Sequence, residues 1–379
     1  MKILITTCGV GIGHASRDLA LAKTLEENNH KVEFASYGSG LKYLKKYDYK
    51  VHKLPQMNFQ GSDGEINIEQ SIRQSKDIPF TFIKSMYKES RIVRKVKPDI
   101  VVSDSHYSMP ITAKFLNVPC YIITNDLTFG FSKGTDVTAI KYFEKGIRKF
   151  IIDISNGCQK ILVPDIPEAI QIPEELKDKT NYIGPLLHHK INDMETKQQL
   201  RYKHNINLND KMIVVTIGGS EFGKVLIENI IDISEQIKAD KIFIFTGIEI
   251  HSNIFKKYNK EKVNIQEFTP DMVEWMKMSD LTISLAGHTT SMELISIQKP
   301  NIMIPIQNHV EQERNAKRMM EYNISQTLEI NNPTKLLGTI NNMMKNLENI
   351  KINKVAFNEF NMYDGRENAL KLIEKVNTN

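Results

Sequence analysis

The sequence predicts an α/β protein built from two parallel-sheet domains. Short apolar runs with the length of buried strands alternate with helical segments along the chain, a pattern typical of parallel sheets covered by helices. Two glycine-rich turns, at residues 9–13 and 218–223, each follow the first strand of such a series. The chain has 379 residues, too many for one typical core and suited to two domains.

The first half shows a regular alternation of strands and helices. Its apolar runs are bounded by glycine, proline and polar residues, which end elements and turn the chain. We expect strands at 2–7, 30–36, 100–104, 118–124 and 160–164, and helices at 18–28, 78–96, 109–115 and 139–154.

The second half repeats this alternation after a Gly184-Pro185 step and a polar stretch at 192–211. Because Gly-Pro ends an element and redirects the chain, we expect the second domain to begin there. We expect strands at 212–217, 241–246, 265–268, 281–285, 301–305 and 322–330, and helices from about 224 to 237, from 272, from 292, and at 333–347 and 367–376.

Composition indicates a protein that dissolves in water and does not bind nucleic acid. Hydrophobic residues make up 41% and charged residues 25% of the chain, with a formal net charge of +5, and the basic residues are dispersed. Three cysteines lack metal or redox spacing, and no apolar run approaches the ~20 residues that span a bilayer. We therefore expect a cytoplasmic protein, either free or peripheral at the inner face of the membrane.

The first glycine-rich turn carries candidate chemistry. It reads Gly-x-Gly-x-Gly-His, not the Gly-x-Gly-x-x-Gly of dinucleotide sites, and Ser36 and Tyr37 stand where a ribose-binding acid is expected. This disfavours a nicotinamide cofactor. His14 ends the turn, and an imidazole can accept a hydroxyl proton near neutral pH.

Asp104 ends a predicted strand, at the edge where parallel sheets place functional groups. A carboxylate there can fix the tautomer of a nearby histidine. A helix cap is the alternative for Asp104, a capping or packing role is the alternative for His14, and His106 and Asp126 compete for the acid–base role.

The stretch 281–316 predicts a phosphate site. A strand is followed by a turn at Gly287 and then by a helix, so backbone N–H groups and the positive end of the helix dipole face the same point. Glu293, expected within about the first helical turn, can accept hydrogen bonds from ribose hydroxyls. The next strand is expected to end in a loop that carries Glu311, Gln312 and Asn315.

The order of these motifs resembles the GT-B nucleotide-sugar glycosyltransferases, both the MurG-type N-acetylglucosaminyltransferases and the larger UDP-glycosyltransferase superfamily. The resemblance rests on the glycine-histidine-arginine loop at 9–17, Ile-Gly-Pro at 183–185, the glycine loop at 216–220, Phe-x-x-Asp-Met at 268–272, and Glu-Gln to Asn-Ala at 311–316. Its order is specific, although each motif alone is not.

This resemblance implies two facing Rossmann-like βαβ domains with a cleft between them and a C-terminal helix crossing back to the first domain. It implies an acceptor-binding domain at 1–185, a donor-binding domain at 186–355 and a final segment at 356–379 that packs on the first domain. No Asp-x-Asp occurs in the sequence, so we expect a metal-independent enzyme without a cofactor.

The implied activity is an inverting glycosyl transfer of a hexose or N-acetylhexosamine from a UDP-sugar to a hydroxyl acceptor, lipid-linked or cell-envelope glycans included. His14 would be the base and Asp104 its partner, with Gly11, Gly13 and Arg17 in an acceptor-side loop. The implied donor-binding residues are Gly218, Gly219, Ser220, Phe268, Thr269, Gly287, His288, Thr289, Thr290, Glu293, Glu311 and Gln312.

Two other functions remain open at this point. A UDP-N-acetylglucosamine 2-epimerase has the same two-domain architecture, and a non-catalytic nucleotide-sugar-binding subunit would need no base. The basic, amphipathic segment 78–96 also has two interpretations, as a membrane-facing element or as a helix that packs one face on the sheet.

Overall fold

The computed structural model describes residues 1–56, 61–62, 65–66, 78–127, 138–189, 193–219 and 221–375. The chain divides into two compact units. The first unit comprises residues 1–60, 67–188 and 362–379, and the second comprises 61–66 and 189–361. The final segment, expected at 356–379, begins in this division at Met362.

The first unit is built on a parallel sheet, and its described part has seven strands in the order β3-β2-β1-β6-β7-β8-β9. The central strands are buried on both faces, as their continuous apolar runs predict. The bounds are β1 (Lys2–Thr7), β2 (Lys31–Ser36), β3 (Val51–Lys53), β6 (Ile100–Asp104), β7 (Cys120–Ile123), β8 (Lys160–Val163) and β9 (Thr180–Tyr182).

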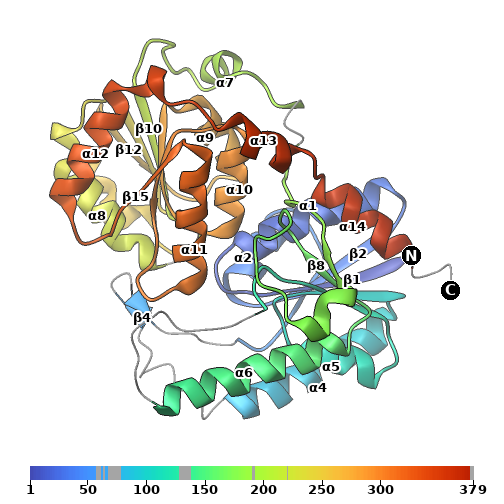
Figure 1. Cartoon of the computed structure of the whole chain (residues 1–379). Helices are drawn as coiled ribbons and strands as arrows, with labels where there is room; N and C mark the ends of the chain where they lie inside the picture. Colours follow the sequence, from blue (N-terminus) through green and yellow to red (C-terminus); the bar gives the residue numbers. More distant parts are fainter. Residues whose placement is uncertain are drawn as a thin grey trace. The chain divides into compact units, whose positions relative to one another are not determined.

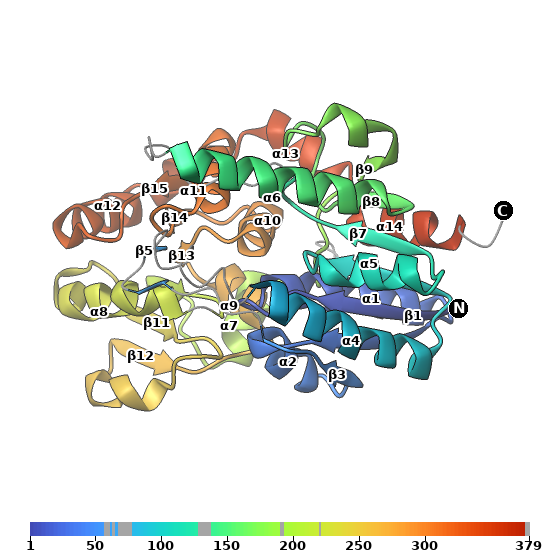
Figure 2. The ribbon, with the colours of Figure 1, turned by 90° about the horizontal axis from the view of Figure 1, so that it is seen from below.

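Helices cover both faces of this sheet (Figures 1 and 2). One face carries α1 (Gly13–Glu27), α2 (Gly38–Lys45) and α14 (Gly365–Glu374), and the other carries α4 (Ile78–Val96), α5 (Ser108–Phe115) and α6 (Thr138–Asn156). Leu4, Val101 and Ile122 of the sheet share a core with Val93 of α4 and Met109 of α5. In the part of the chain that the structure describes, no helix has the length and apolar content that crossing a bilayer requires.

The start of α1 was predicted too late. The helix begins at Gly13 rather than at residue 18, so His14 and Arg17 are helical. Its N-cap residue, Ile12, has no side chain that can cap the helix, so the sequence carries none of the usual start signals.

The second unit repeats this plan. The described part of its main sheet has six parallel strands in the order β12-β11-β10-β13-β14-β15. In Figure 1, α8 and α12 cover one face, and α9, α10 and α11 cover the other. The bounds are β10 (Met212–Thr216), β11 (Lys241–Phe245), β12 (Val263–Gln266), β13 (Leu281–Leu285), β14 (Asn301–Ile304), β15 (Ser325–Thr327), α8 (Lys224–Ile233), α9 (Met272–Met278), α10 (His288–Ser296), α11 (Val310–Met319) and α12 (Pro333–Lys345).

Shorter elements complete the two units. The strand expected at 265–268 is β12, which ends at Gln266, and the strand expected at 322–330 is only the three residues of β15. The remaining elements are β4 (Gly61–Ser62), β5 (Glu65–Ile66), η2 (Glu174–Lys179), α7 (Lys197–Lys203), η4 (Glu221–Gly223), η5 (Ser234–Gln236), η6 (Ser252–Tyr258), η7 (Met320–Tyr322), η8 (Leu347–Asn349) and α13 (Lys354–Asn361).

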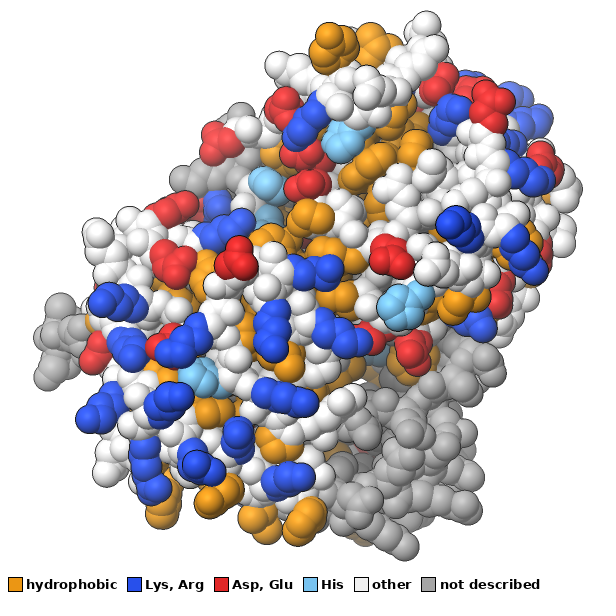
Figure 3. Space-filling model, turned by 180° about the vertical axis from the view of Figure 1, so that it is seen from behind, with side chains coloured by type: hydrophobic (Ala, Val, Ile, Leu, Met, Phe, Trp, Pro, Cys, Tyr) orange, Lys and Arg blue, Asp and Glu red, His pale blue; other side chains and the backbone are white. Residues whose placement is uncertain are grey.

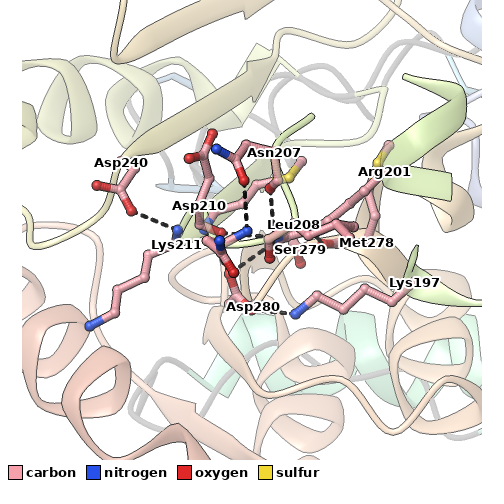
Figure 4. Close-up of polar contacts among 12 residues, drawn as sticks. Lys197, Arg201, Asn207, Leu208, Asp210, Lys211, Asp240, Met278, Ser279 and Asp280 are labelled. Carbon is pink, nitrogen blue, oxygen red and sulfur yellow. Dashed lines mark hydrogen bonds and ion pairs between the residues drawn. The ribbon is translucent and has the colours of Figure 1, made fainter. Parts of the chain in front are cut away.

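A buried arginine fastens α7 to the amino-terminal edge of the second sheet (Figure 4). Arg201 is 1% exposed, and its guanidinium donates to the Met278 carbonyl at 2.9 Å and to the Asp280 carboxylate at 3.0 Å. It also donates to the carbonyls of three residues that lead into β10: Asn207, Leu208 and Asp210. These bonds satisfy the buried cation and fix the sheet edge that lies opposite the strands' carboxyl ends.

Each sheet winds in both directions from one point. The reversal lies between β1 and β6 in the first unit and between β10 and β13 in the second. Open parallel sheets bind ligands outside the carboxyl ends of the strands at such a switch point. The fold therefore marks two places for function, one in each unit.

Two segments of the first unit meet at glycines. Gly184 has a φ of +91°, and a Cβ at Gly365 would lie 2.3 Å from the Gly184 carbonyl oxygen and 2.5 Å from that of Pro185. Nearby, the Asn368 amide donates to the Ile183 carbonyl at 2.8 Å. The helix α14 is thus held against the segment that follows β9 by contacts that admit no side chain.

We expect Gly365→Ala to lower the free energy of unfolding by about 1–3 kcal/mol, because the added methyl group overlaps two carbonyl oxygens. Gly338→Ala in α12 is the matched control, since its methyl group meets no described heavy atom within 4 Å. That control should stabilise by about 0.5–1 kcal/mol. Denaturant unfolding measures both, and equal effects would contradict the close contact at Gly365.

Candidate active site

The switch point of the first unit holds a buried cluster of charged side chains. Asp104 ends β6 and is fully buried. His14 Nδ1 lies 2.9 Å from Asp104 Oδ1, and Arg17 Nε donates to Asp104 Oδ2 at 2.6 Å. His14 and Arg17 lie in the first turn and a half of α1, so their spacing puts both on the side of the helix that meets β6. The predicted His14–Asp104 pair is therefore formed in the structure.

The Arg17 charge sets the state of Asp104. Burial alone would raise the pKa of the Asp104 carboxyl, but Arg17 and His14 outweigh it and hold that pKa well below its usual range. Asp104 is therefore a carboxylate at neutral pH. A carboxylate only accepts hydrogen bonds, so it favours the His14 tautomer that carries its proton on Nδ1.

That tautomer leaves Nε2 as the proton acceptor. Arg17 Nη2 also lies 2.9 Å from His14 Nδ1, but it donates to Asp104 Oδ1 as well. His14 Nδ1 can donate to Asp104 or accept from Arg17, but not both. Because Asp104 can only accept, and Arg17 has Asp104 as another acceptor, we assign the proton to Nδ1. The His14 side chain is 23% exposed, so the ring combines a buried anchor with access to solvent.

Asp18 is a member of this cluster that sequence reasoning missed. Its side chain is fully buried, and Thr7 Oγ1 donates to its Oδ2 at 2.6 Å. Burial and the neighbouring Asp104 carboxylate raise the pKa of the Asp18 carboxyl well above its usual range, which favours its protonated form. In the sequence, Asp18 is marked only by its place next to Arg17. An exposed aspartate in a helix could stand at the same place, so this does not indicate a buried role.

Two alternatives for the acidic and basic residues are now excluded. Asp104 does not cap the following helix, because the N-cap of α5 is Tyr107 and no side chain caps it. His106 is fully buried, with Nε2 held 2.8 Å from Glu89 Oε1, so its ring cannot contact a substrate that binds from solvent. Of the two histidines, His14 is the one that solvent reaches.

The acceptor-side loop needs a correction at Arg17. This residue is 2% exposed and bonded to Asp104, so it positions other groups rather than lining a loop. The reason is the early start of α1, which turns Arg17 inward. Gly11 does lie in the turn, with a φ of +67° that favours glycine, and Gly13 is the first residue of α1.

The switch point of the second unit holds the glycine turns. Gly218 and Gly219 follow β10, and Gly287 follows the neighbouring strand β13 as the N-cap of α10. Gly218 has a φ of +66°. Gly287 brings no side chain to cap α10, whose first turn holds His288, Thr289 and Thr290. The positive end of the helix dipole favours an anion at this point. Ser220 falls outside the described residues.

Glu293 lies deeper in α10 than predicted. The helix begins at His288, so Glu293 is in its second turn rather than its first. The side chain is buried, and burial raises the pKa of its carboxyl to about 8. A buried carboxyl of this kind is costly in the free protein and is the type of group that polar ligand contacts would stabilise.

Glu311 and Gln312 lie in a helix, not in the predicted loop. Both belong to the first turn of α11, and the loop after β14 ends at the N-cap His309. Gln312 Oε1 accepts from the Ile306 backbone N–H at 3.0 Å. Asn315 Nδ2 donates to the Ala286 carbonyl at 3.1 Å, so the asparagine of the motif joins α11 to the turn before α10.

Phe268 and Thr269 lie just past β12, and both are half-buried. Thr269 Oγ1 accepts from the Asp271 N–H at 3.2 Å, which forms the turn that opens α9. The backbone at Phe268 and Thr269 is placed where it could contact a nucleobase. Among the described residues, no cluster of three or more histidine, cysteine or acidic side chains could hold a metal ion, and metal independence stays a prediction.

These two units, each with its functional groups at a switch point, define a two-domain enzyme of the GT-B class. The family model "Glycosyl transferase family 1" matches residues 1–214, and the model "Glycosyltransferase family 28 C-terminal domain" matches residues 212–369. The chain belongs to glycosyl transferase family 1 and is a MurG-like glycosyltransferase, which confirms the predicted family, fold class and enzyme type.

Relatives and solved structures agree with this. An uncharacterized glycosyltransferase of Methanosarcina mazei is 29% identical, over 89% of this chain and 88% of its own. A UDP-N-acetylglucosamine–N-acetylmuramyl-(pentapeptide) pyrophosphoryl-undecaprenol N-acetylglucosamine transferase of Clostridium tetani is 26% identical, over 100% and 99%. The fold matches Acinetobacter baumannii MurG, with 17% identity, 99% of each chain covered and a TM-score of 0.59. It also matches the glycosyltransferase VinC in complex with DTDP, with 13% identity, full coverage of both and a TM-score of 0.65.

We expect Glu293→Gln to change how stability depends on pH. The folded state raises the pKa of Glu293 from 4.5 to about 8, so it keeps a proton that the unfolded chain has released. This contribution is present below about pH 4.5 and is lost as the pH rises to about 8, at up to ~1.4 kcal/mol per pH unit. Glutamine cannot ionise, so the variant should lack this loss.

Urea unfolding at about pH 5, 7 and 9 measures the difference between the two proteins. Glu313→Gln, at an exposed position of α11, removes the same charge without burial and should follow the wild type. Parallel pH curves for wild type and Glu293→Gln would show that Glu293 is ionised in the folded protein.

Proposed function

We propose that this glycosyltransferase transfers a hexose or N-acetylhexosamine from a UDP-sugar to a hydroxyl acceptor with inversion at the anomeric carbon. The single observation that carries the proposal is the His14–Asp104 pair, with Nδ1 2.9 Å from the buried carboxylate and the ring partly exposed. This is the arrangement of a histidine poised to take a proton from a ligand outside.

In the proposed reaction, His14 Nε2 takes the proton of the acceptor hydroxyl. The oxygen forms its bond to the anomeric carbon from the face opposite the nucleotide, which gives inversion. Asp104 accepts from Nδ1–H throughout and stabilises the imidazolium that forms. Arg17 keeps Asp104 ionised, since its charge offsets the burial of that carboxylate.

The bond between the anomeric carbon and the phosphate oxygen breaks, and its electron pair leaves with UDP. Backbone N–H groups of the turn at Gly218 and the amino end of α10 at Gly287 would stabilise the diphosphate charge. Glu293 would accept from the ribose hydroxyls, and the backbone after Phe268 would face the uracil. Glu311 and the amide nitrogen of Gln312, whose oxygen already binds Ile306, would bind sugar hydroxyls.

The choice of UDP and of acceptor class rests on relatives. The Clostridium tetani relative is named as using UDP-N-acetylglucosamine and an undecaprenol-linked acceptor, whereas VinC was solved with DTDP. The whole-chain match to the former supports a UDP-sugar donor and a lipid-linked or cell-envelope acceptor. We propose that no metal is needed, because the helix dipole and backbone donors can neutralise the diphosphate.

We expect His14→Ala to lower kcat for transfer by about 10²–10⁴-fold, because it removes the base, and to leave UDP affinity unchanged. Calorimetry with UDP, and with GDP, TDP and NAD as comparison ligands, measures binding, and product formation from UDP-sugars measures transfer. His251→Ala, at a side chain 82% exposed in the second unit, is the matched control.

Each failure of this experiment has a distinct meaning. Transfer that persists in His14→Ala would refute the base assignment. Preference for TDP would redirect the donor proposal, and binding of NAD or of none of these nucleotides would refute it. Conversion of the UDP-sugar without any acceptor would identify a 2-epimerase, and UDP binding with no turnover in the wild type would identify a binding subunit.

We further propose that the helices α4 and α6 contact the inner face of the membrane. Hydrophobic side chains gather along the lower edge of Figure 3, beneath many lysines and arginines. On α4, Phe80, Ile83 and Tyr87 recur at helical spacing and are 73%, 67% and 65% exposed, and on α6 Tyr142 is 73% exposed. The basic residues beside them are Lys84, Lys88, Arg91, Arg94, Lys95, Lys141, Lys145, Arg148 and Lys149.

Apolar side chains that enter the acyl boundary, with cations at the headgroups, are the features of an interfacial helix. We expect Ile83→Glu to weaken binding to phosphatidylglycerol vesicles about ten-fold or more, since it removes apolar area and adds a repelled charge. Sedimentation with vesicles measures this. Tyr202→Glu, at an 86% exposed side chain of α7, should bind as the wild type does, and equal loss in both variants would contradict a specific membrane face.

A further inference from the structure

A second buried polar network lies behind the His14–Asp104 pair, and the proposed reaction does not use it. Glu89 of α4 is fully buried, and its carboxylate accepts four hydrogen bonds. His106 Nε2 lies 2.8 Å from Oε1, Ser108 Oγ 2.5 Å from Oε1, Thr112 Oγ1 2.7 Å from Oε2, and Ser85 Oγ 2.9 Å from Oε1. Burial would raise the pKa of Glu89, but the hydrogen bonds from His106, Ser108 and Thr112 outweigh it and lower that pKa.

The network is attached to the turn that carries Asp104. Ser105 separates Asp104 from His106 and has a φ of +49°, a left-handed conformation that is unfavourable for a serine and must be held by its surroundings. The backbone supplies part of the restraint: Ser105 N donates to the Ile123 carbonyl at 3.1 Å, and Ser103 Oγ donates to the His106 carbonyl at 2.7 Å. The His106–Glu89 hydrogen bond supplies the remaining restraint on this turn, from the buried side of the sheet.

The same histidine also supports the turn that precedes His14. The His106 ring lies 5.9 Å from the Tyr37 ring, between centroids. The Tyr37 hydroxyl is 3.5 Å from the Sγ of Cys8, the residue that follows β1, and the Cys8 N–H donates to the Asp104 carbonyl at 3.0 Å. The turn before His14 and the turn at Asp104 are therefore both supported by the buried Glu89–His106 network.

Stability alone does not account for the Glu89–His106 network. A buried polar group of this kind is commonly replaceable by apolar side chains of similar volume at no loss of stability. What apolar packing cannot supply is a directional restraint on a strained turn. We propose that Glu89 and His106 are positioning residues, which hold the Asp104 turn and thereby set the orientation of His14.

This proposal rests on the proposed function for its kinetic consequence, but its structural part can be tested without transfer. In His106→Phe the ring contact with Tyr37 is kept and the hydrogen bond to Glu89 is lost. We expect kcat to fall about 10- to 100-fold, as for a misplaced catalytic group, with the KM for the UDP-sugar within about two-fold because the donor residues lie on the second unit. The acidic limb of the pH–rate profile should also move.

Two matched variants separate positioning from a general loss of stability. His106→Gln keeps a nitrogen donor for Glu89 and should recover kcat to within about three-fold of the wild type. Ser85→Ala removes a donor that comes from α4 itself and should leave both kcat and the pH profile unchanged. Thermal unfolding of all variants shows whether each remains folded.

The decisive measurement is the nitrogen NMR spectrum of His14 in protein with labelled histidine. We expect the Nδ1–H tautomer in the wild type and in His106→Gln, and a mixture of tautomers in His106→Phe. A wild-type His14 spectrum and wild-type kcat in folded His106→Phe would overturn the proposal, as would equal losses in Ser85→Ala. If His14→Ala keeps its transfer activity, the base assignment fails, yet the NMR result still decides whether His106 orients His14.

Discussion

The Arg17–Asp104 ion pair is the interaction on which the rest of the first unit's site depends. It keeps a fully buried carboxylate ionised, because the Arg17 guanidinium donates to both oxygens of Asp104. Burial and Asp104 raise the pKa of the neighbouring Asp18 carboxyl, which favours its protonated form. The buried Asp104 charge orients His14, and solvent screens this charge little.

The two units place their functional groups by the same rule. The carboxyl ends of parallel strands lie at one edge of the sheet, and the winding reverses there between two neighbouring turns. In the first unit a histidine and a carboxylate lie at this point, and in the second unit glycine turns and a helix N-terminus lie there. At the opposite edge of the second sheet, Arg201 joins α7 to the amino ends of the strands through its carbonyl partners.

The sequence was sufficient for the architecture because buried parallel strands are short apolar runs, and because the motifs at residues 9–17 and 311–316 are set in order along the chain. It was less reliable where no local signal exists. The helix α1 starts at Gly13 without a capping side chain, and α11, which carries Glu311, likewise begins without one. The place of Asp18 beside Asp104 and the pairing of Glu89 with His106 were not recognised, since both come from contacts between residues apart in the chain.

The Asn315–Ala286 hydrogen bond has a consequence for substrate choice. It joins the helix whose first turn carries Glu311 and Gln312 to the turn that precedes the amino end of α10. In the proposed donor complex, the sugar and the diphosphate are therefore held by one connected piece of protein. A sugar that fits α11 poorly would also disturb the contacts of the phosphates, so discrimination between donors would show in the rate of bond breaking and not only in how tightly the donor is held.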